Sequence, residues 1–502
     1  MSTMTEPRPA EIKSFVPASG HPQFFLVPVA KAIRAMPWRF AAISLLLLVP
    51  CFWQPHIEAG DLASHAYNAW LVRLIQQGRM PELSIGRQPT NVLFDYMLEG
   101  LIGTCGVEGA QRVAVSIAVL IFFWSAFSLV SAVVGKLPWF LTPVFAILAY
   151  GTVFNKGLFN YYLAGAFSLA ALAMLWHATL WDAAVAPLLL GLGWASQPLP
   201  VLWAIAVFGY VLLARWLPAR LRVLLFLVCV GALFGLRYFI RTHWTSKWEF
   251  RQVLHVTGID QSFFLGHHFR IVSLALLAVS FVGLLHLLSK VQVLGLLLSI
   301  PVQIYVLCLI GCFLLPHTIG MPWYKASFGG VDVRIGWLAA VFLCAVLAQV
   351  ENPVWYGSAL GIVALVYFGF LYADHRAMNQ LEQRVEELVS TLPPHARVIG
   401  RLYYPLVDGF DESMILDRAC IGKCYSFGNY EAATGEFRVH ASAGNSIVIW
   451  SMNPERRMFS AANQFFSVMP DGTLYMIYNC GDKVRDVCLR NLTRTDLPSL
   501  EE

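Results

Sequence analysis

Charged residues are scarce in the first three quarters of this chain. The 502 residues are 13% charged and 58% hydrophobic, whereas soluble proteins carry about a quarter charged residues. Residues 1–372 hold 35 Asp, Glu, Lys and Arg residues, and the much shorter segment 373–502 holds 30. This shortage excludes an ordinary soluble fold for the first part. It predicts a boundary near Tyr372 between a membrane part and a water-soluble tail.

Dense runs of Lys and Arg are missing as well. The basic residues stand singly or in pairs near the ends of apolar runs, as residues that anchor a span at lipid headgroups do. Residues 1–372 contain 22 basic and 13 acidic residues, and the tail contains 13 and 17. This distribution excludes nucleic acid as a partner and predicts membrane lipid as one. We also find no internal repeat, no low-complexity tract and no signal-peptide cleavage site.

The apolar runs predict an α-helical polytopic membrane protein of about eleven spans, followed by a small α+β domain. The membrane core is expected at 38–372, with a mean hydropathy of +0.62 for the whole chain. Several runs are shorter than the roughly 20 residues that a straight span needs. The expected spans are Trp38–Trp53, Arg112–Val134, Trp139–Thr152, Leu158–Trp181, Ala183–Ala195, Leu199–Trp216, Leu221–Ile240, Ile271–Leu288, Val291–Leu315, Ile335–Gln349 and Val354–Tyr372.

The basic residues near span ends give an orientation. One group precedes the first span at 31–39, and another lies in a short later loop at 215–222. Because cytoplasmic loops are enriched in Lys and Arg, both groups are expected in the cytoplasm. We therefore expect a multi-pass protein of the cell inner (plasma) membrane with a cytoplasmic N-terminal segment, 1–37. The segments expected outside are the loops 54–111, 241–270 and 316–334 and the extracytoplasmic domain 373–502.

The tail carries four cysteines, Cys420, Cys424, Cys480 and Cys488. An even number of cysteines in a small domain outside the cytoplasm favours two disulfides. A four-cysteine zinc site is the alternative, although the CxxxC and Cx7C spacings fit a zinc ribbon poorly.

Local patterns in the tail predict its secondary structure. An amphipathic stretch at 374–390 predicts a helix that ends before Pro393. Short apolar runs at Arg397–Tyr403, Ser446–Trp450 and Thr473–Tyr478 are separated by Gly, Asn, Asp and Pro, and predict strands. A helix with a few strands makes a small α+β domain.

The loop after the first span contains the residue pattern most suggestive of chemistry. Asp61–Gln77 has helical periodicity, and Glu58 and Asp61 lie at its start. His65 is four residues after Asp61 and so lies on the same helix face. A carboxylate and an imidazole one turn apart can bind a polar ligand together. The alternative is that Asp61 only caps the helix.

Several segments resemble the GT-C superfamily of integral membrane glycosyltransferases. A first span, an acidic outer loop, an amphipathic helix ending in Gly-x-x-Pro, many further spans and a soluble C-terminal domain are similar in layout to that superfamily. The Phe-Asn-Tyr sequence before a span and Gln-Pro in place of a frequent His-Pro add to the likeness. The segments that carry it are Glu58–Asp61, His65–Asn68, Gly78–Pro81, Asn155–Leu163 and Ser196–Pro198, together with the basic and aromatic stretch Lys325–Arg334.

The resemblance implies an enzyme that transfers a sugar from a polyprenyl-phosphate-linked donor. The acceptor would be a glycan, lipid or protein on the outer face of the membrane. Asp61 would be the general base and Glu58 its neighbour. Arginine and lysine side chains at the outer face would bind the carrier phosphate. The residues expected to bind substrate are His65, Asn160, Gln197, Arg241, Lys325 and Arg334.

Metal and non-enzymatic alternatives stay open at this point. His255, Asp260 and His267-His268 match no specific set of metal ligands, so no metal residue is predicted. A divalent cation remains possible because some GT-C enzymes use one. The alternative function is a non-catalytic scaffold or a transporter of similar fold. Acidic residues lie in loops and are almost absent from the spans, which favours the enzyme over a transporter.

Overall fold

The computed structural model describes most of the chain. The described residues are 32–176, 180–250, 252–255, 257–262, 266–290, 293–322, 327–350, 354–402, 413–427, 429, 431–432, 436–442, 445–447, 465–467, 469–481 and 486–496. Lys325, most of the N-terminal segment 1–37 and part of the stretch Ser446–Trp450 therefore lie outside the described residues.

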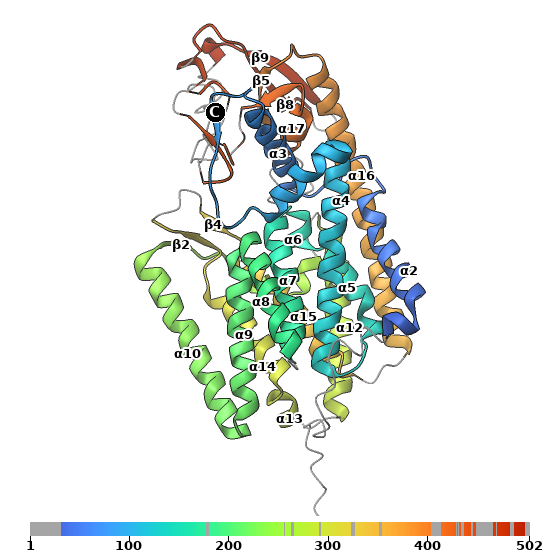
Figure 1. The fold of residues 1–502 in the computed structure, drawn as a ribbon. Coiled ribbons are helices and arrows are strands. Elements are labelled where there is room, and N and C mark those ends of the chain that lie inside the picture. Colours follow the sequence, from blue (N-terminus) through green and yellow to red (C-terminus); the bar gives the residue numbers. More distant parts are fainter. Residues whose placement is uncertain are drawn as a thin grey trace, which may run out of the picture.

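Helices make up the membrane part, which is drawn in Figure 1 below the small sheets of the tail. The first half of it contains α2 (Pro37–Leu48), α3 (Leu62–Gln76), α4 (Leu93–Val134), η2 (Trp139–Leu141), α5 (Thr142–Ala149), α6 (Thr152–Asn155), α7 (Phe159–Leu175), α8 (Leu180–Ser196) and α9 (Pro198–Trp216). The second half contains α10 (Ala219–His243), α11 (Gln252–His255), η3 (Ile259–Ser262), α12 (Phe269–Lys290), α13 (Val293–Leu297), α14 (Ile300–Leu314), α15 (Val331–Leu347) and α16 (Val354–Ser390).

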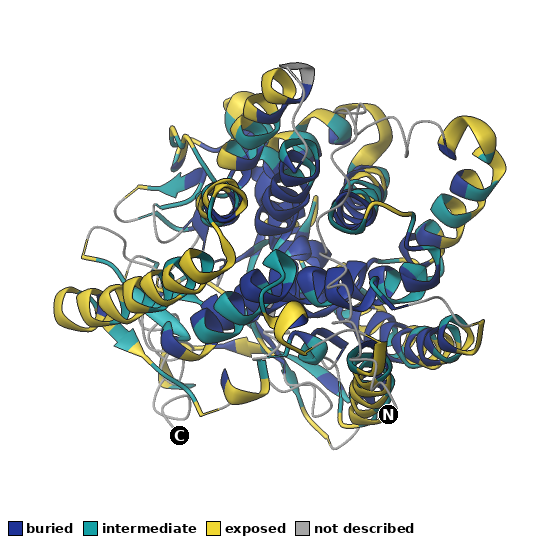
Figure 2. Cartoon of the chain, turned by 90° about the horizontal axis from the view of Figure 1, so that it is seen from below, coloured by how far each residue is buried: buried dark blue, intermediate teal, exposed yellow. Residues whose placement is uncertain are grey.

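Five of these helices are long and apolar enough to cross a membrane, namely α4, α9, α10, α12 and α16. Five shorter apolar segments accompany them, with bounds of Pro37–Cys51, Trp139–Asn155, Phe159–Leu175, Asp182–Ser196 and Ile300–Leu314. The chain is therefore a helical protein with membrane-type segments, and the count of eleven spans stays a prediction. Viewed along the bundle, buried residues fill the interior and exposed ones lie on the outward helix faces (Figure 2). The most outlying helix is α10, of whose apolar window only 6% is buried.

Two long helices, α4 and α16, extend from the membrane part toward the tail and toward the loop after the first apolar segment. α4 has 42 residues and bends at Gly106, whose φ of 71° is left-handed, so the expected span at 112–134 is only its second part. α16 has 37 residues and runs from Val354 to Ser390 without a break. The boundary expected at Tyr372 thus falls inside one helix, and the predicted tail helix 374–390 is the continuation of the last span. A rigid helix of this kind fixes the tail relative to the bundle.

The tail is an α+β unit. It contains β5 (Ala396–Arg401), α17 (Ser413–Cys420), β6 (Cys424–Ser426), β7 (Val439–Ala441), β8 (Leu474–Asn479) and β9 (Val487–Leu492). Four strands form a sheet in the order β6-β5-β8-β9, in which β5 runs parallel to β6 and β8, and β9 is antiparallel to β8. The strands expected near Arg397 and Thr473 are β5 and β8. The residues of 446–450 that are described are not in a strand.

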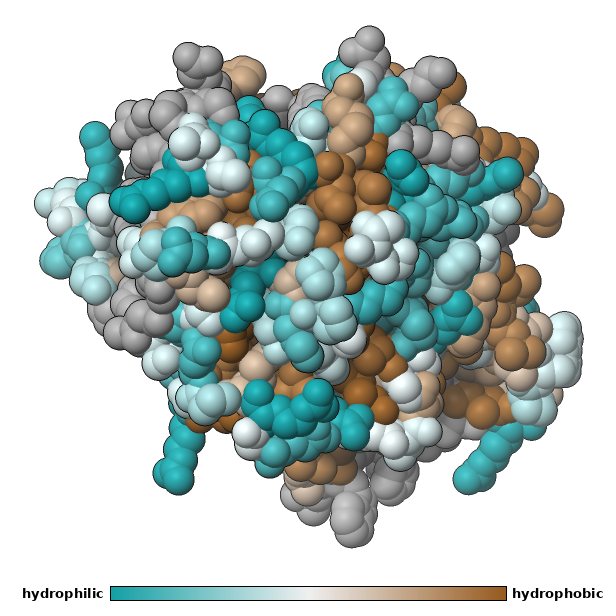
Figure 3. Space-filling view, turned by 90° about the horizontal axis from the view of Figure 1, so that it is seen from above, coloured by the Kyte–Doolittle hydropathy of each residue, from teal (hydrophilic) through white to brown (hydrophobic). Residues whose placement is uncertain are grey.

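The tail packs directly on the loop that follows the first apolar segment, which the sequence predicts to lie outside and which is called the first outer loop below. β1 (Leu83–Ile85) of that loop pairs with β7 in antiparallel register, with Leu83 opposite Ala441 and Ile85 opposite Val439. A second small sheet, β2 (Thr245–Lys247), β3 (Thr318–Gly320) and β4 (Phe328–Gly329), joins the two other outer loops. Seen from above, hydrophilic residues cover much of this end of the molecule (Figure 3). Polar side chains far apart in the sequence are therefore gathered at one end of the helical bundle.

Candidate functional site

Two glycines bring the first outer loop against the loop before α7. Gly60 and Gly157 have φ values of +28° and +73°. A Cβ on Gly60 would lie 2.4 Å from the carbonyl oxygen of Lys156, and one on Gly157 would lie 2.3 Å from the backbone nitrogen of Asp61. Neither position tolerates a side chain, because both the space and the backbone conformation require glycine. The backbone N–H of Asp61 donates to the Lys156 carbonyl at 3.2 Å, which fixes Asp61 beside Lys156.

Asp61 precedes the first turn of α3 without capping it. Its backbone carbonyl accepts from the N–H of His65 at 2.9 Å, but its side chain makes no capping hydrogen bond with the described backbone of α3. The side chain is partly exposed. Its negative charge acts on the neighbouring ionisable groups Lys156, His65 and Glu431. The capping alternative therefore loses its geometric basis, and the carboxylate acts electrostatically on the charged groups around it.

Lys156 and Arg334 form the cationic side of the site. Burial is the main cause that lowers the pKa of the Lys156 ammonium, and the charge of Arg334 lowers it further. The Arg334 guanidinium lies over the rings of Tyr161 and Phe328, 5.1 and 4.5 Å from their centroids. It also donates from Nε to the carbonyl of Gly329 at 3.3 Å. Two half-buried cations that interact electrostatically create a place where an anion is stabilised.

His65 lies in a buried polar cluster drawn from four parts of the chain. Its Nδ1 is 2.7 Å from Oδ1 of Asp95 on α4 and 3.7 Å from Oε1 of Glu431 in the tail. Asn160, at the start of α7, donates from Nδ2 to Oδ2 of Asp95 at 3.0 Å and accepts from the N–H of Phe94 at 2.9 Å. The sequence pattern identified His65 and Asn160 separately. The structure joins them through Asp95, which no local signal could have indicated.

The pKa values of this cluster depend on its charges. Burial lowers the pKa of His65, but the charge and hydrogen bond of Asp95 outweigh it and raise the value to about 10. Burial, together with the negative charges of Asp95, Asp61 and Asp417, raises the pKa of Glu431 to about 8, although His65 opposes this. Both shifts mean that the folded protein holds protons which the unfolded chain releases more readily.

We expect the contribution of His65 to stability to depend on pH. Because its folded pKa lies above the usual 6.5, this contribution is complete below about pH 6.5 and is lost as the pH rises toward 10. The melting temperature of detergent-purified wild type should therefore exceed that of His65→Gln most at low pH, and the difference should shrink between pH 7 and 10. A difference that grows with pH would contradict the assignment of a protonated His65.

Glu58 contacts the tail and α16. It is 2% exposed, its Oε1 accepts from Nδ2 of Asn379 at 2.9 Å, and its Oε2 is 3.4 Å from Nη2 of Arg418. Burial and the nearby Glu382 raise the pKa of Glu58. Its contacts join the loop to α16 and α17. The geometry therefore gives Glu58 a structural partner in the tail and does not bring it to an acceptor beside Asp61.

Arg418 of α17 is the centre of that junction. It donates from Nε and Nη2 to the two carboxylate oxygens of Glu382 at 2.6 and 2.5 Å. Its Nη1 donates to the Ile57 carbonyl and to Oε1 of Gln111, both at 3.0 Å. The start of the first outer loop, α4 and α16 thus meet at one buried guanidinium of α17. Sequence reasoning missed Arg418 because it is one isolated arginine in the soluble tail.

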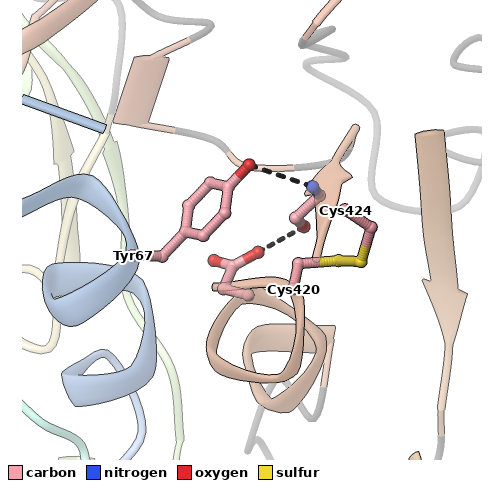
Figure 4. Close-up of a disulfide and its surroundings, with 5 residues drawn as sticks. Tyr67, Cys420 and Cys424 are labelled. Atoms are coloured by element: carbon pink, nitrogen blue, oxygen red, sulfur yellow. Dashed lines mark hydrogen bonds between the residues drawn. A yellow bond between two sulfur atoms is a disulfide. The ribbon is translucent and has the colours of Figure 1, made fainter. Parts of the chain in front are cut away.

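The first disulfide lies beside α3. Cys420 is bonded to Cys424, and Cys480 to Cys488, in agreement with the disulfide prediction and against the zinc alternative. Figure 4 shows the Cys420–Cys424 bond between α17 and β6. Next to it, the Tyr67 hydroxyl accepts from the N–H of Ser426 at 3.0 Å, and the Ser426 hydroxyl donates to Asp417. The bond therefore fixes the tail surface that covers α3.

We expect the two disulfides to stabilise different parts of the structure. Removing either by double Cys→Ser substitution should cost about 2–4 kcal/mol of stability. Only the Cys420/Cys424 variant should speed amide hydrogen exchange in α3, because the Ser426–Tyr67 contact lies next to that bond. The Cys480/Cys488 variant is the matched control, because that disulfide links the end of β8 to β9. Equal exchange of α3 in both variants would contradict this role.

Gln197 and Arg241 belong to other elements than Asp61. Gln197 precedes α9, and its Oε1 accepts from the N–H of Leu199 at 3.3 Å, so it caps that helix. Arg241 is exposed in the last turn of the outlying helix α10. Lys325 is outside the described residues. Of the six predicted substrate-binding residues, the structure connects His65 with Asn160 and places Arg334 near Lys156.

Comparisons with known proteins name no family for this chain. It matches no protein-family model, no curated protein and no solved structure.

Proposed function

We propose that this protein is a membrane glycosyltransferase of the GT-C type. It would transfer a sugar from a polyprenyl-phosphate-linked donor to a glycan, lipid or protein acceptor on the outer face of the plasma membrane. The observation that carries the proposal is the backbone contact of Asp61 with Lys156, whose ammonium interacts electrostatically with Asp61 and Arg334. The apolar helices support a membrane-embedded donor.

The arrangement suits the transfer of a sugar from a phosphate. As the bond between the sugar and the phosphate breaks, negative charge collects on the phosphate oxygens, and Lys156 and Arg334 would stabilise it. The acceptor hydroxyl must lose its proton as it attacks the anomeric carbon, and Asp61 would take that proton. His65, held by Asp95, lies one helical turn from Asp61 and would bind a polar group of the acceptor or donor. The residues of the site thus supply a base and a phosphate-binding pair.

The test is turnover of a panel of radiolabelled polyprenyl-phosphate sugars by the purified protein. Lys156→Met should raise KM for the active donor about 10- to 100-fold, since a hydrogen bond to a charged group is worth about 1.5–3 kcal/mol. Lys247→Met is the matched control, because the Lys247 side chain is 74% exposed and pairs only with Glu249 among the described residues. Transfer by wild type that the Lys156 variant alone weakens would support the proposal. No turnover of any donor by folded protein would favour the scaffold or transporter alternative.

A further inference from the structure

A line of acidic and histidine side chains joins the second and third outer loops. Asp260 Oδ2 is 2.9 Å from Nδ1 of His255, and Nε2 of the same ring is 3.8 Å from Oδ2 of Asp332. Oδ1 of Asp332 is 2.7 Å from Nδ1 of His317, whose Nε2 is 4.0 Å from Oε2 of Glu249. Asp332 is thus contacted by both histidines. This line of residues is separate from the Asp61–His65 cluster.

Asp332 is the unusual member of this line. Its side chain is 0% exposed, and Oδ2 has no hydrogen-bond partner among the described residues. A buried carboxylate oxygen without a partner is costly and calls for a ligand, either an ion or a water. The 3.8 Å between Oδ2 and Nε2 of His255 is too long for a hydrogen bond. It is shorter than the roughly 4.2 Å between two ligands on opposite sides of an ion with bonds of about 2.1 Å, so one ion can contact both atoms.

The surroundings of His255 match those of a metal-binding histidine. Such a histidine binds the ion with one ring nitrogen and donates the other N–H to a carboxylate, which fixes the tautomer. Here Asp260 accepts from Nδ1 and leaves Nε2 directed toward Asp332. The His255 side chain is 23% exposed, so an ion can reach Nε2 from outside although Asp332 is buried.

Charge at this end of the bundle also favours a cation. Lys156 is coupled electrostatically to Asp61, Glu249 and Asp332 and to one cation, Arg334. With Asp260 there are four carboxylates, and the fixed positive charges are those of Lys156, Arg334 and Lys247, which pairs with Glu249 at 3.3 Å. One negative charge remains, and either a bound cation or a proton on one of the two histidines would balance it. Metal binding by the purified protein distinguishes these two states.

A second group of possible ligands is less suitable. His56, Glu382 and Glu386 have ligand atoms within 4.8 Å of one another. However, both oxygens of Glu382 already accept from Arg418, so a guanidinium occupies the place of a cation.

We propose that His255 Nε2 and Asp332 Oδ2 bind a divalent cation of the Mg²⁺ and Mn²⁺ class. Such ions keep several waters and are commonly held by one or two protein groups together with phosphate oxygens. Two protein ligands beside Lys156 and Arg334 fit that mode of binding. Binding of the ion itself does not require the proposed transfer reaction. Only a contact between the ion and a donor phosphate rests on the proposed function.

The experiment is electron paramagnetic resonance of Mn²⁺ added to chelator-treated, detergent-purified full-length protein without donor. Wild type should bind one Mn²⁺ with a dissociation constant below about 1 mM, and the bound ion should show coupling to a histidine nitrogen. Asp332→Asn should abolish binding, and His255→Gln should abolish the nitrogen coupling. Asp374→Asn is the matched control, because Asp374 forms a similar pair with His268 at 2.9 Å and should leave binding unchanged.

Asp260→Asn should weaken Mn²⁺ binding about 10- to 100-fold, as loss of a carboxylate that orients a ligand does. No bound Mn²⁺ in wild type, or equal binding in wild type and folded Asp332→Asn, would overturn the proposal. If the Asp332 variant does not fold, the His255→Gln variant is the test, because His255 is partly exposed. Unchanged nitrogen coupling in His255→Gln would also overturn the proposal. Protein that binds Mn²⁺ yet transfers no sugar would keep the cation site and remove the proposed function, so the two failures are distinguishable.

Discussion

Asp61→Asn is expected to lower kcat for sugar transfer by about 10²- to 10⁴-fold, which is the usual contribution of a general base. The amide has nearly the shape of the carboxylate but cannot accept the acceptor proton at neutral pH. Asparagine is also as good a residue as aspartate before a helix, and the backbone contact of Asp61 with Lys156 is unaffected. The melting temperature should therefore change little while transfer is lost.

Single-turnover transfer and a thermal melt, measured on the same purified sample, check this expectation. Glu387→Gln is the control, since Glu387 is an exposed carboxylate that pairs with Arg384 one turn away on α16. That variant should keep full activity. Transfer by Asp61→Asn within about threefold of wild type would exclude Asp61 as the base, because even a weak general base contributes about 100-fold.

Arg418→Met should destabilise the protein by about 3–5 kcal/mol, the usual cost of removing one partner of a buried ion pair. It would leave Glu382 and Glu58 buried without their cation, and both are at most 2% exposed. It would also remove the donors to Ile57 and Gln111. The first outer loop should then separate more easily from the tail, so transfer should fall together with stability.

Urea or thermal unfolding of Arg418→Met beside the double variant Arg418→Met/Glu382→Met measures this effect. The double variant should recover part of the lost stability, because it no longer buries the Glu382 charge. Arg384→Met is the matched control, since Arg384 forms only an exposed i,i+3 pair with Glu387 among the described residues, which contributes about 0–1 kcal/mol. A loss below 1 kcal/mol for Arg418→Met would show that the junction does not hold the loop.

Much of the local structure could be predicted because it depends on neighbouring residues. Apolar runs of helical length indicated the helices, and the first outer loop carries the expected helix, since α3 spans Leu62–Gln76. The even number of tail cysteines predicted two disulfides, and the structure decided their pairing over four and eight residues. One expected span is divided into α13 and α14, and the last expected span continues into the tail as α16. Composition alone did not show where these helices begin and end.

The candidate site was only partly predictable, because most of its contacts join residues that are far apart in the sequence. Asp61 and His65 are one helical turn apart, so periodicity brought them together. Glu58 was paired with Asp61 because it is near in sequence, whereas the structure pairs it with Arg418, 360 residues away. Lys156 lay within a recognised motif, but its place beside Asp61 depends on the contact of Gly60 with Gly157 and its neighbours.

The sequence by itself determined a helical, membrane-type chain with a disulfide-containing α+β tail and an acidic first outer loop. These properties follow from composition, periodicity and short spacings, which are local. Only the tertiary structure decided that the tail covers α3, that Asp95 and Glu431 share His65, and that Asp332 lies buried between two histidines. Such contacts join residues 15 to about 370 positions apart, and they form because helices and strands dock to bury apolar surface and neutralise charge. No local pattern encodes which partners that docking selects.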